Sequence, residues 1–290
     1  MTDGMVLVTG ATGNTGRPLV EMLRDSDVPV RAMVRSAAAG AQLAGRTVEV
    51  VVADFDDPES ISAALAGVER AYLVTPSSEG AQGQQERFVE LAAKAGVQQL
   101  VKLSQLAADE GSPVRFLRYH AAVERRVREV GIGFTFLRPN LYFQGLFALS
   151  GPIRDQGVLP APIGDARVSA VDVRDIAAVA AAALTEPGHM GATYTITGPA
   201  AITHAEIADA VGAATGRNIS FVDVPPEAFR AALDGVLPAW QLDGLVEDYA
   251  HYQRGEAADV LPTVTEITGQ QPRDITRFAH DYADRFTATG

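Results

Sequence analysis

The stretch that decides the fold reads Met5-Val6-Leu7-Val8-Thr9-Gly10-Ala11-Thr12-Gly13-Asn14-Thr15-Gly16. Its first four residues are apolar and predict a buried parallel strand, and helical spacing begins at Arg17. Three glycines, each separated by two residues, therefore stand between a strand and a helix, which is the context of a dinucleotide fingerprint. Gly10 allows the tight turn, Gly13 lets the backbone approach a pyrophosphate, and Gly16 lets the helix pack close to the sheet. N–H groups at the helix start then bind the anion. We expect the cofactor-binding residues of this turn to be Gly10, Thr12, Gly13, Asn14, Thr15 and Gly16.

Strand and helix patterns alternate through the rest of the first half. Apolar runs predict strands at 28–34, 48–53, 70–74, 99–103 and 133–137. Helical patterns lie between them at 58–66, 82–95 and 113–130, and Asp57-Pro58 is a good helix start. This alternation predicts an α/β fold, a Rossmann-type doubly wound parallel sheet that binds ligands at the carboxyl ends of its strands.

The pattern changes after Ser150. Residues 151–166 are rich in Gly and Pro and predict a loop, and 173–184 predicts an alanine-rich helix that returns to the sheet. Strands are expected at 193–196 and 219–224, and helices at 226–234, 240–254 and 275–286. A further helix is expected to begin at Thr203-His204-Ala205-Glu206, which has the pattern of a capping box. We therefore expect an NAD(P)-binding domain at 1–150, to which 167–190 returns. A smaller C-terminal α/β substrate-covering region is expected at 151–166 and 191–290.

Composition excludes several functions. The net charge of −12 argues against a nucleic-acid surface, and the absence of cysteine excludes thiol nucleophiles, disulfides and thiolate metal sites. The five histidines show no ligand spacing, so no metal site is expected. No apolar run reaches the length of a membrane span and the first strand begins almost at once, so we expect a cytoplasmic protein. Its expected partner is a small-molecule substrate, and a homodimer is left open.

Arg35 indicates which dinucleotide binds. The fingerprint usually places Asp or Glu after the second strand to bind a ribose 2′-hydroxyl, but this chain has Arg35 there with no carboxylate beside it. A guanidinium suits a 2′-phosphate, so NADP(H) is favoured over NAD(H); the alternative is a solvated surface arginine. Asp54 and Phe55 follow the third strand and are expected beside the adenine. Thr75 and Pro76, after the fourth strand, complete this part of the cofactor site.

With these residues in place, the chain resembles the NmrA-like branch of the atypical short-chain dehydrogenases/reductases. The likeness covers nearly the whole length. It rests on 8–16, Val34-Arg35, Ala53-Asp54, Ala95-Gly96-Val97, Ser104, 131–140 (with Arg138-Pro139-Asn140) and 194–199. The resemblance implies the Rossmann-type fold and NADP(H), with Ser104 and Asn140 in the site. Within this family the chain is most similar to NADPH-dependent quinone reductases of the quinone oxidoreductase 2 type.

The catalytic pattern departs from that of most short-chain dehydrogenases. They carry Tyr-x-x-x-Lys, but here the two lysines, Lys94 and Lys102, follow Glu90 and Gln98 at that spacing. Counted back from Gly131-Ile132, the family's lysine position falls on His120 and its tyrosine position on Phe116.

His120 is therefore the first catalytic candidate, either as a proton donor or as a ligand of the nicotinamide ribose. The alternative is a half-buried helix histidine bonded to a backbone carbonyl. Ser104 is the second candidate, and its alternative role is in a turn. Tyr142 is the third, because it follows the sixth strand where a substrate pocket would open; its alternative role is core packing.

The Tyr-x-x-x-Lys pattern passes a proton to the oxygen of the substrate, and its absence bears on which substrates the protein can reduce. Reduction of a ketone gives an alkoxide of pKa about 15, whereas a quinone gives a phenolate-like oxygen of pKa about 10. We therefore expect an NADPH-dependent oxidoreductase that transfers hydride to a quinone-like or conjugated carbonyl acceptor. The main alternative is a non-catalytic NADP-binding, redox-sensing regulator of the NmrA type. A third reading is a reductase or isomerase for one specialised metabolite.

Overall fold

The computed structural model describes residues 4–287, which form two units. The first unit runs to Ser112 and adds Leu117–Pro139 and Val173–Thr195. The second unit comprises Pro113–Phe116, Asn140–Asp172 and the chain from Ile196 onward.

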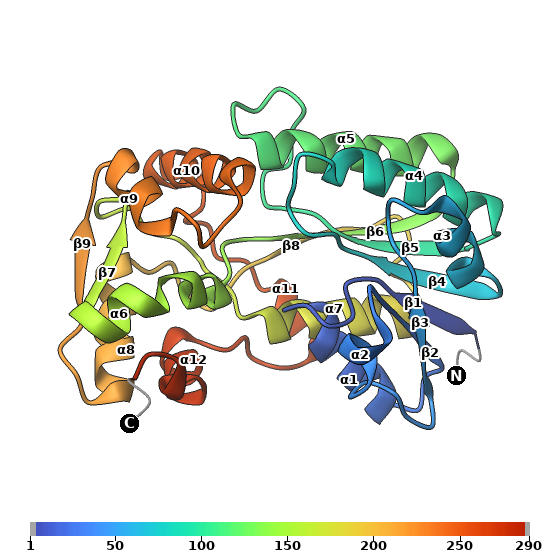
Figure 1. Ribbon diagram of the computed structural model, residues 1–290, viewed down its shortest axis with the longest axis horizontal. Coiled ribbons are helices and arrows are strands. Elements are labelled where there is room, and N and C mark those ends of the chain that lie inside the picture. The colour runs from blue at the N-terminus through green and yellow to red at the C-terminus, as the bar shows by residue number, and fades with distance from the viewer. Residues whose placement is uncertain (1–3, 288–290) are drawn as a thin grey trace. The chain divides into compact units, whose positions relative to one another are not determined.

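The first unit is built on a seven-stranded sheet (Figure 1). Its strands are β1 (Met5–Val8), β2 (Val30–Val34), β3 (Val48–Val52), β4 (Val68–Leu73), β5 (Gln99–Leu103), β6 (Gly133–Pro139) and β8 (Thr193–Ile196). Their order is β3-β2-β1-β4-β5-β6-β8, and the pairs from β3 to β6 are all parallel. The order reverses beside β1, so the glycine turn that follows β1 lies where doubly wound sheets bind their ligands. The predicted Rossmann-type α/β fold is confirmed.

Helices cover both faces of this sheet. They are α1 (Gly16–Asp25), α2 (Ala37–Gly40), α3 (Pro58–Leu65), α4 (Ala81–Lys94), α5 (Arg115–Val130) and α7 (Val173–Thr185). Apolar side chains of α3, α4 and α5, among them Ile61, Phe88 and Val123, share one core with the strands. Helix α7 packs against α1 and against β4, β5 and β6 on the other face (Figure 1). The sequence missed α2, a single turn capped by Ser36.

Strand β8 lies in the large sheet, whereas the sequence assigned it to the smaller C-terminal region. The Gly191 N–H donates to Phe134 O, and the Phe136 N–H donates to Ala192 O. These bonds satisfy backbone groups of β6 that would otherwise face an open sheet edge. The pairing partner, rather than the sequence pattern of the strand, decides where such a segment belongs.

The second unit combines short helices with a two-stranded sheet. Its strands β7 (Val158–Ala161) and β9 (Ser220–Asp223) are parallel. Its helices are η1 (Phe143–Leu149), α6 (Ser150–Gln156), α8 (His204–Thr215), α9 (Pro226–Leu233), α10 (Ala239–Gln253), α11 (Thr263–Thr268), α12 (Ile275–Asp281) and η2 (Ala283–Arg285). The predicted capping box of Thr203 and Glu206 begins α8.

Residues 151–166 do not form the predicted loop. Pro152 falls in the first turn of α6, where its missing N–H has no helical acceptor to lose. Gly157 ends α6 in the left-handed conformation, at φ +68°. Pro160 is tolerated in β7 because this strand pairs only with β9. The glycines and prolines therefore mark the ends and edges of two elements.

Within residues 4–287 we find no helix with the length and apolar character that a bilayer crossing requires.

Candidate active site

The backbone geometry of the turn between β1 and α1 explains why glycines occupy it, because larger residues would clash with neighbouring atoms or be strained. Gly10 has φ +56°, in the left-handed region that favours glycine. A Cβ on Gly16 would lie 2.2 Å from the Gly10 carbonyl oxygen, and one on Gly13 would lie 3.1 Å from the same atom. Thr9 fixes the turn to β4, since its hydroxyl contacts Val74 O and accepts from Val74 N, both at 2.9 Å.

This turn presents unused backbone donors. Within the described residues, the N–H groups of Thr12, Asn14 and Thr15 donate no backbone hydrogen bond. Thr12, Gly13 and Asn14 are exposed, and α1 has no side-chain cap. Free N–H groups at the start of a helix bind phosphate oxygens. The residues present therefore fit a dinucleotide pyrophosphate.

The residues predicted beside the adenosine follow β2, β3 and β4. Arg35 is exposed, and its side chain makes no hydrogen bond or ion pair to the described part of the chain. Asp54 accepts from Asp56 N, while Phe55 packs on Phe88 with ring centroids 5.8 Å apart.

Two further cofactor candidates, Thr75 and Pro76, follow β4. The Thr75 hydroxyl accepts from Gln85 at 2.8 Å, and the adjoining Pro76 is exposed. The cofactor roles of these residues, and of Arg35, Asp54 and Phe55, stay predictions.

Arg35 gives the first test. We expect the native protein to bind NADPH about tenfold or more tightly than NADH, because an unpaired guanidinium makes charge-assisted hydrogen bonds to a 2′-phosphate. Arg35→Asp should abolish the preference, and Arg35→Lys, which keeps the charge but loses the planar fork, should retain part of it. Calorimetric titration with both nucleotides measures this. Equal affinities in the native protein would refute the assignment.

The predicted Ser104 belongs to a buried ionic network. Its hydroxyl donates to Glu124 Oε1 at 2.6 Å. Arg138, on β6, donates to both oxygens of Glu124, at 2.9 and 2.6 Å. Burial opposes the charged carboxylate, but the hydrogen bonds from Arg138 and Ser104 outweigh it and lower the pKa of Glu124. The Ser104 proton is thus already engaged, and this serine positions Glu124 in the structure.

His120 lies against a lysine that comes from a different element. His120 stands one turn before Glu124 on α5, so both side chains lie on one side of that helix. Lys102, on β5, stands two residues before Ser104, which directly follows the strand, so these two side chains point the same way. Lys102 Nζ is 2.7 Å from His120 Nδ1 and 3.0 Å from Leu103 O. Lys102 is fully buried and His120 is 9% exposed.

The electrostatics of this pair follow mainly from burial. Desolvation lowers the pKa of Lys102 to about 7, with the Glu124 charge raising it and the Arg138 charge lowering it. Desolvation and the charges of Lys102 and Arg138 hold the pKa of His120 well below its ordinary value. His120 is therefore neutral at pH 7, and its Nδ1 accepts a hydrogen bond from Lys102 Nζ. That hydrogen bond leaves the ring proton on Nε2.

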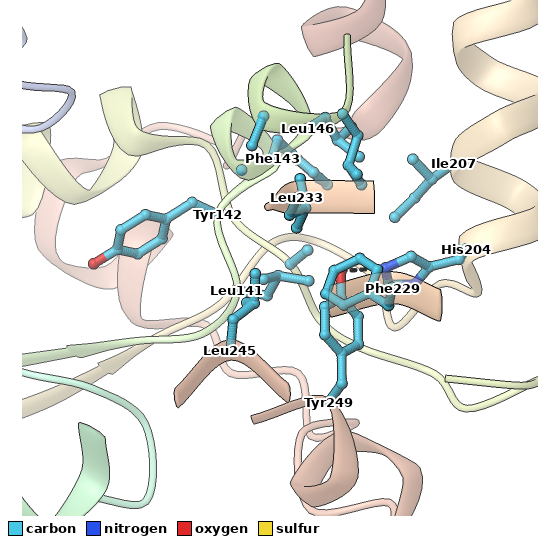
Figure 2. A pocket seen from close by; sticks show the side chains of 14 residues that line it. Leu141, Tyr142, Phe143, Leu146, His204, Ile207, Phe229, Leu233, Leu245 and Tyr249 are labelled. Atoms are coloured by element: carbon cyan, nitrogen blue, oxygen red, sulfur yellow. Dashed lines mark hydrogen bonds between the residues drawn. The ribbon is translucent and has the colours of Figure 1, made fainter. Parts of the chain in front are cut away.

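Asn140 and Tyr142 lie in the second unit. The Asn140 side chain donates to Ser169 Oγ and Ala257 O, both at 2.8 Å, and accepts from Leu141 N. Its amide is thus occupied by protein groups. Tyr142 points away from His204 and Tyr249 in Figure 2. The roles predicted for both residues are not tested by these contacts.

The fold and this geometry can be compared with known proteins. The model of the NmrA-like family matches residues 2–279. The chain belongs to the NmrA-like family. It is 36% identical to an NAD(P)H azoreductase of Xenophilus azovorans, covering 98% of this chain and 100% of that protein. It is 30% identical to quinone oxidoreductase 2 of Escherichia coli, over 91% and 94% of the two chains.

The fold of the chain is also similar to a solved structure of a quinone oxidoreductase. The NADPH-dependent quinone oxidoreductase of Escherichia coli, in complex with NADPH, has a TM-score of 0.86 to this chain. It is 28% identical and the match covers 96% and 99% of the two chains. The resemblance to NmrA-like and quinone oxidoreductase 2-type proteins is confirmed.

Sequence reasoning missed Lys102, Glu124 and Arg138. Lys102 does not complete a Tyr-x-x-x-Lys pattern, since Gln98 stands four residues before it. The available signal was its place in Gln99-Leu100-Val101-Lys102-Leu103, a strand that is buried in the parallel sheet. A charged side chain in such a strand needs a partner, and lysines are almost never fully buried without one.

Proposed function

We propose that the protein transfers hydride from NADPH to a neutral quinone-like or conjugated carbonyl acceptor, with protonation through His120 in place of a tyrosine. The chain is an NAD(P)H-dependent reductase and its cofactor is NADP(H), in keeping with its relatives. The observation that carries the finer proposal is the contact of 2.7 Å between Lys102 Nζ and His120 Nδ1.

NADPH, when bound, supplies the hydride. The oxygen of the acceptor then gains negative charge, and His120 Nε2 donates its proton to that oxygen. His120 Nδ1 takes a proton from Lys102 Nζ at the same time, so the ring stays neutral and Lys102 becomes the neutral amine. Lys102 is reprotonated from water, which closes the proton balance.

His120 and Lys102 together form a weak acid, which is sufficient for some acceptors and not for others. The pKa difference of about five units between an alkoxide and a phenolate corresponds to about 7 kcal/mol of anion stability supplied by the acceptor itself. A quinone therefore needs little help from the protein, whereas a simple ketone needs a strong, well-placed acid.

The test is a panel of acceptors with the purified protein and NADPH. Oxidation of NADPH is followed at its absorbance band with a soluble naphthoquinone, an azo dye and cyclohexanone. We expect turnover with the quinone and a rate for cyclohexanone at least about a hundredfold lower. Tight NADPH binding without turnover of any acceptor would refute the proposal and favour a redox-sensing regulator.

His120→Ala tests the proton donor. We expect it to lower kcat for the quinone by about tenfold to a hundredfold, the lower range for general acid catalysis. Tyr119→Phe is the matched control, because the Tyr119 ring packs at 4.1 Å on the His120 ring and phenylalanine keeps that packing. The control should leave kcat almost unchanged. An equal loss in both variants would mean that the tyrosine is the acid.

A further inference from the structure

Four buried side chains at β5 and α5 form a closed ring of neighbours. Lys102, on β5, and Ser104, directly after that strand, point the same way. His120 and Glu124 stand one turn apart on the same side of α5. Lys102 contacts His120 at 2.7 Å, and Ser104 donates to Glu124 at 2.6 Å. The Glu124 carboxylate therefore lies beside the pair to which we assign proton delivery.

Glu124 is held in its charged form. Its side chain is 1% exposed, and Arg138, from the neighbouring strand β6, donates to both of its oxygens. Arg128 lies 3.3 Å from the same carboxylate but is exposed, so solvent screens its charge. Burial disfavours the charge of Glu124, but the hydrogen bonds from Arg138 and Ser104 outweigh that effect and lower its pKa. Glu124 is therefore ionised at pH 7.

The two charges of this ion pair act on Lys102 with opposite signs. The Glu124 carboxylate favours the protonated lysine, and the Arg138 guanidinium disfavours it. The carboxylate has the larger effect, because it is buried, whereas the Arg138 side chain is 25% exposed and its charge is better screened. His120, the other titratable group in contact with this lysine in the described part of the chain, is neutral.

The position of the ion pair indicates a role in the reaction. The free energy lost when two charges leave water can exceed their attraction, so apolar residues often stabilise a core as well as a buried ion pair does. Charges that alter how firmly a neighbouring group holds its proton are concentrated at functional sites. Glu124 and Arg138 are such charges, since the group beside them is Lys102.

We propose that the Glu124–Arg138 ion pair sets the pH above which Lys102 no longer supplies a proton, and that both are positioning residues of the reaction. Glu124 keeps Lys102 protonated near neutral pH, and Arg138 holds the carboxylate ionised while limiting its effect on the lysine. The proton that Lys102 gives to His120 Nδ1 is replaced from water, as the ring passes its Nε2 proton to the acceptor. The inference rests on the proposed function, but its first test needs no turnover.

Lysine NMR measures this proton directly. The chain has two lysines, so the NADP⁺-loaded protein labelled with ¹³C at lysine Cε gives one signal for Lys102 and one for the exposed Lys94. In the native protein the Lys102 signal should titrate at about pH 7. Glu124→Gln should lower that titration point by about one pH unit or more, the effect of one nearby opposite charge. Glu129→Gln, at an exposed position of α5, is the matched control and should leave it unchanged.

The second charge is tested in the Glu124→Gln background, where position 124 no longer titrates. Adding Arg138→Met should raise the Lys102 titration point again, part of the way to the native value, because a positive charge is lost. The double variant leaves neither charge without its partner, so it tests the ion pair if Glu124→Gln alone does not fold. An unchanged titration point in Glu124→Gln, or a double variant that titrates at or above the native point, would overturn the inference.

Kinetics then connects the lysine to the reaction. The fall of kcat for a soluble quinone above neutral pH should move with the Lys102 titration point in each variant. A titration point that shifts while the kcat profile stays native would overturn the inference, because the ion pair would then act on a lysine that the reaction does not use. A native protein without quinone turnover would refute the proposed function, and the NMR titration would still decide whether Glu124 holds the Lys102 proton.

Discussion

Replacing Lys102 by methionine is expected to slow quinone reduction by about tenfold to a hundredfold while making the fold more stable at pH 7. Methionine has an apolar side chain of similar length, but it cannot donate a hydrogen bond or a proton to His120 Nδ1. In the native protein this proton is lost as the pH rises through the Lys102 pKa of about 7. The kcat of the native protein should therefore fall above neutral pH, and that fall should be absent in the variant.

The gain in stability follows from the same pKa. Folding lowers the pKa of Lys102 from its ordinary 10.5 to about 7, so the unfolded chain binds a proton that the folded chain gives up. Burial of Lys102 therefore lowers the free energy of unfolding. This loss has its full size below pH 7, becomes smaller as the pH rises, and is absent above pH 10.5. Its full size corresponds to about 5 kcal/mol. The variant leaves His120 Nδ1 and Leu103 O without this donor, which costs about 1–3 kcal/mol and reduces the net gain.

Urea unfolding and steady-state kinetics over pH 6–9.5 measure both effects. Lys94→Met is the matched control, because Lys94 is the other lysine of the chain and is exposed at the end of α4. The control should change neither the pH profile nor the free energy of unfolding. A Lys102→Met protein that is less stable at pH 7 and keeps the native pH profile would show that the lysine has only a structural role.

The sequence predicted the parts of the fold that depend on local patterns. The glycine turn, the strands before it and after it, and the capping box of α8 each carry their signal within a few residues. Local chemistry predicts a loop at Gly157 and Pro160, because these residue types fit a loop as well as they fit a helix end or an edge strand. Only the pairing of β7 with β9 distinguishes the two readings.

The candidate site was predicted less completely, because its contacts join residues that are distant in sequence. His120 and Ser104 were identified by position, but their partners Lys102 and Glu124 come from other elements. A buried charge in a strand indicates that a partner exists without indicating which residue it is. Likewise, no local pattern shows that the Asn140 amide is occupied by Ser169 and Ala257.

Gly13→Val is expected to weaken NADPH binding by about a hundredfold or more and to leave the fold intact. Gly13 is exposed, and its Cβ would lie 3.1 Å from Gly10 O, a contact that a small shift relieves. The branched side chain would then stand beside the free N–H groups of Thr12 and Asn14. Loss of two hydrogen bonds to a charged pyrophosphate, each about 1.5–3 kcal/mol, accounts for the effect.

Fluorescence titration with NADPH and thermal unfolding measure the two quantities. Gly83→Val is the matched control, because a Cβ at Gly83, within α4, meets nothing within 4 Å. Gly16→Val would not serve, since its Cβ would lie 2.2 Å from Gly10 O and would disturb the packing of α1 itself. Native NADPH affinity in Gly13→Val would mean that this turn does not hold the pyrophosphate. Loss of binding with an unchanged melting temperature would place the anion at the start of α1, because only a ligand that uses the space above Gly13 is sensitive to a side chain that the fold itself accepts.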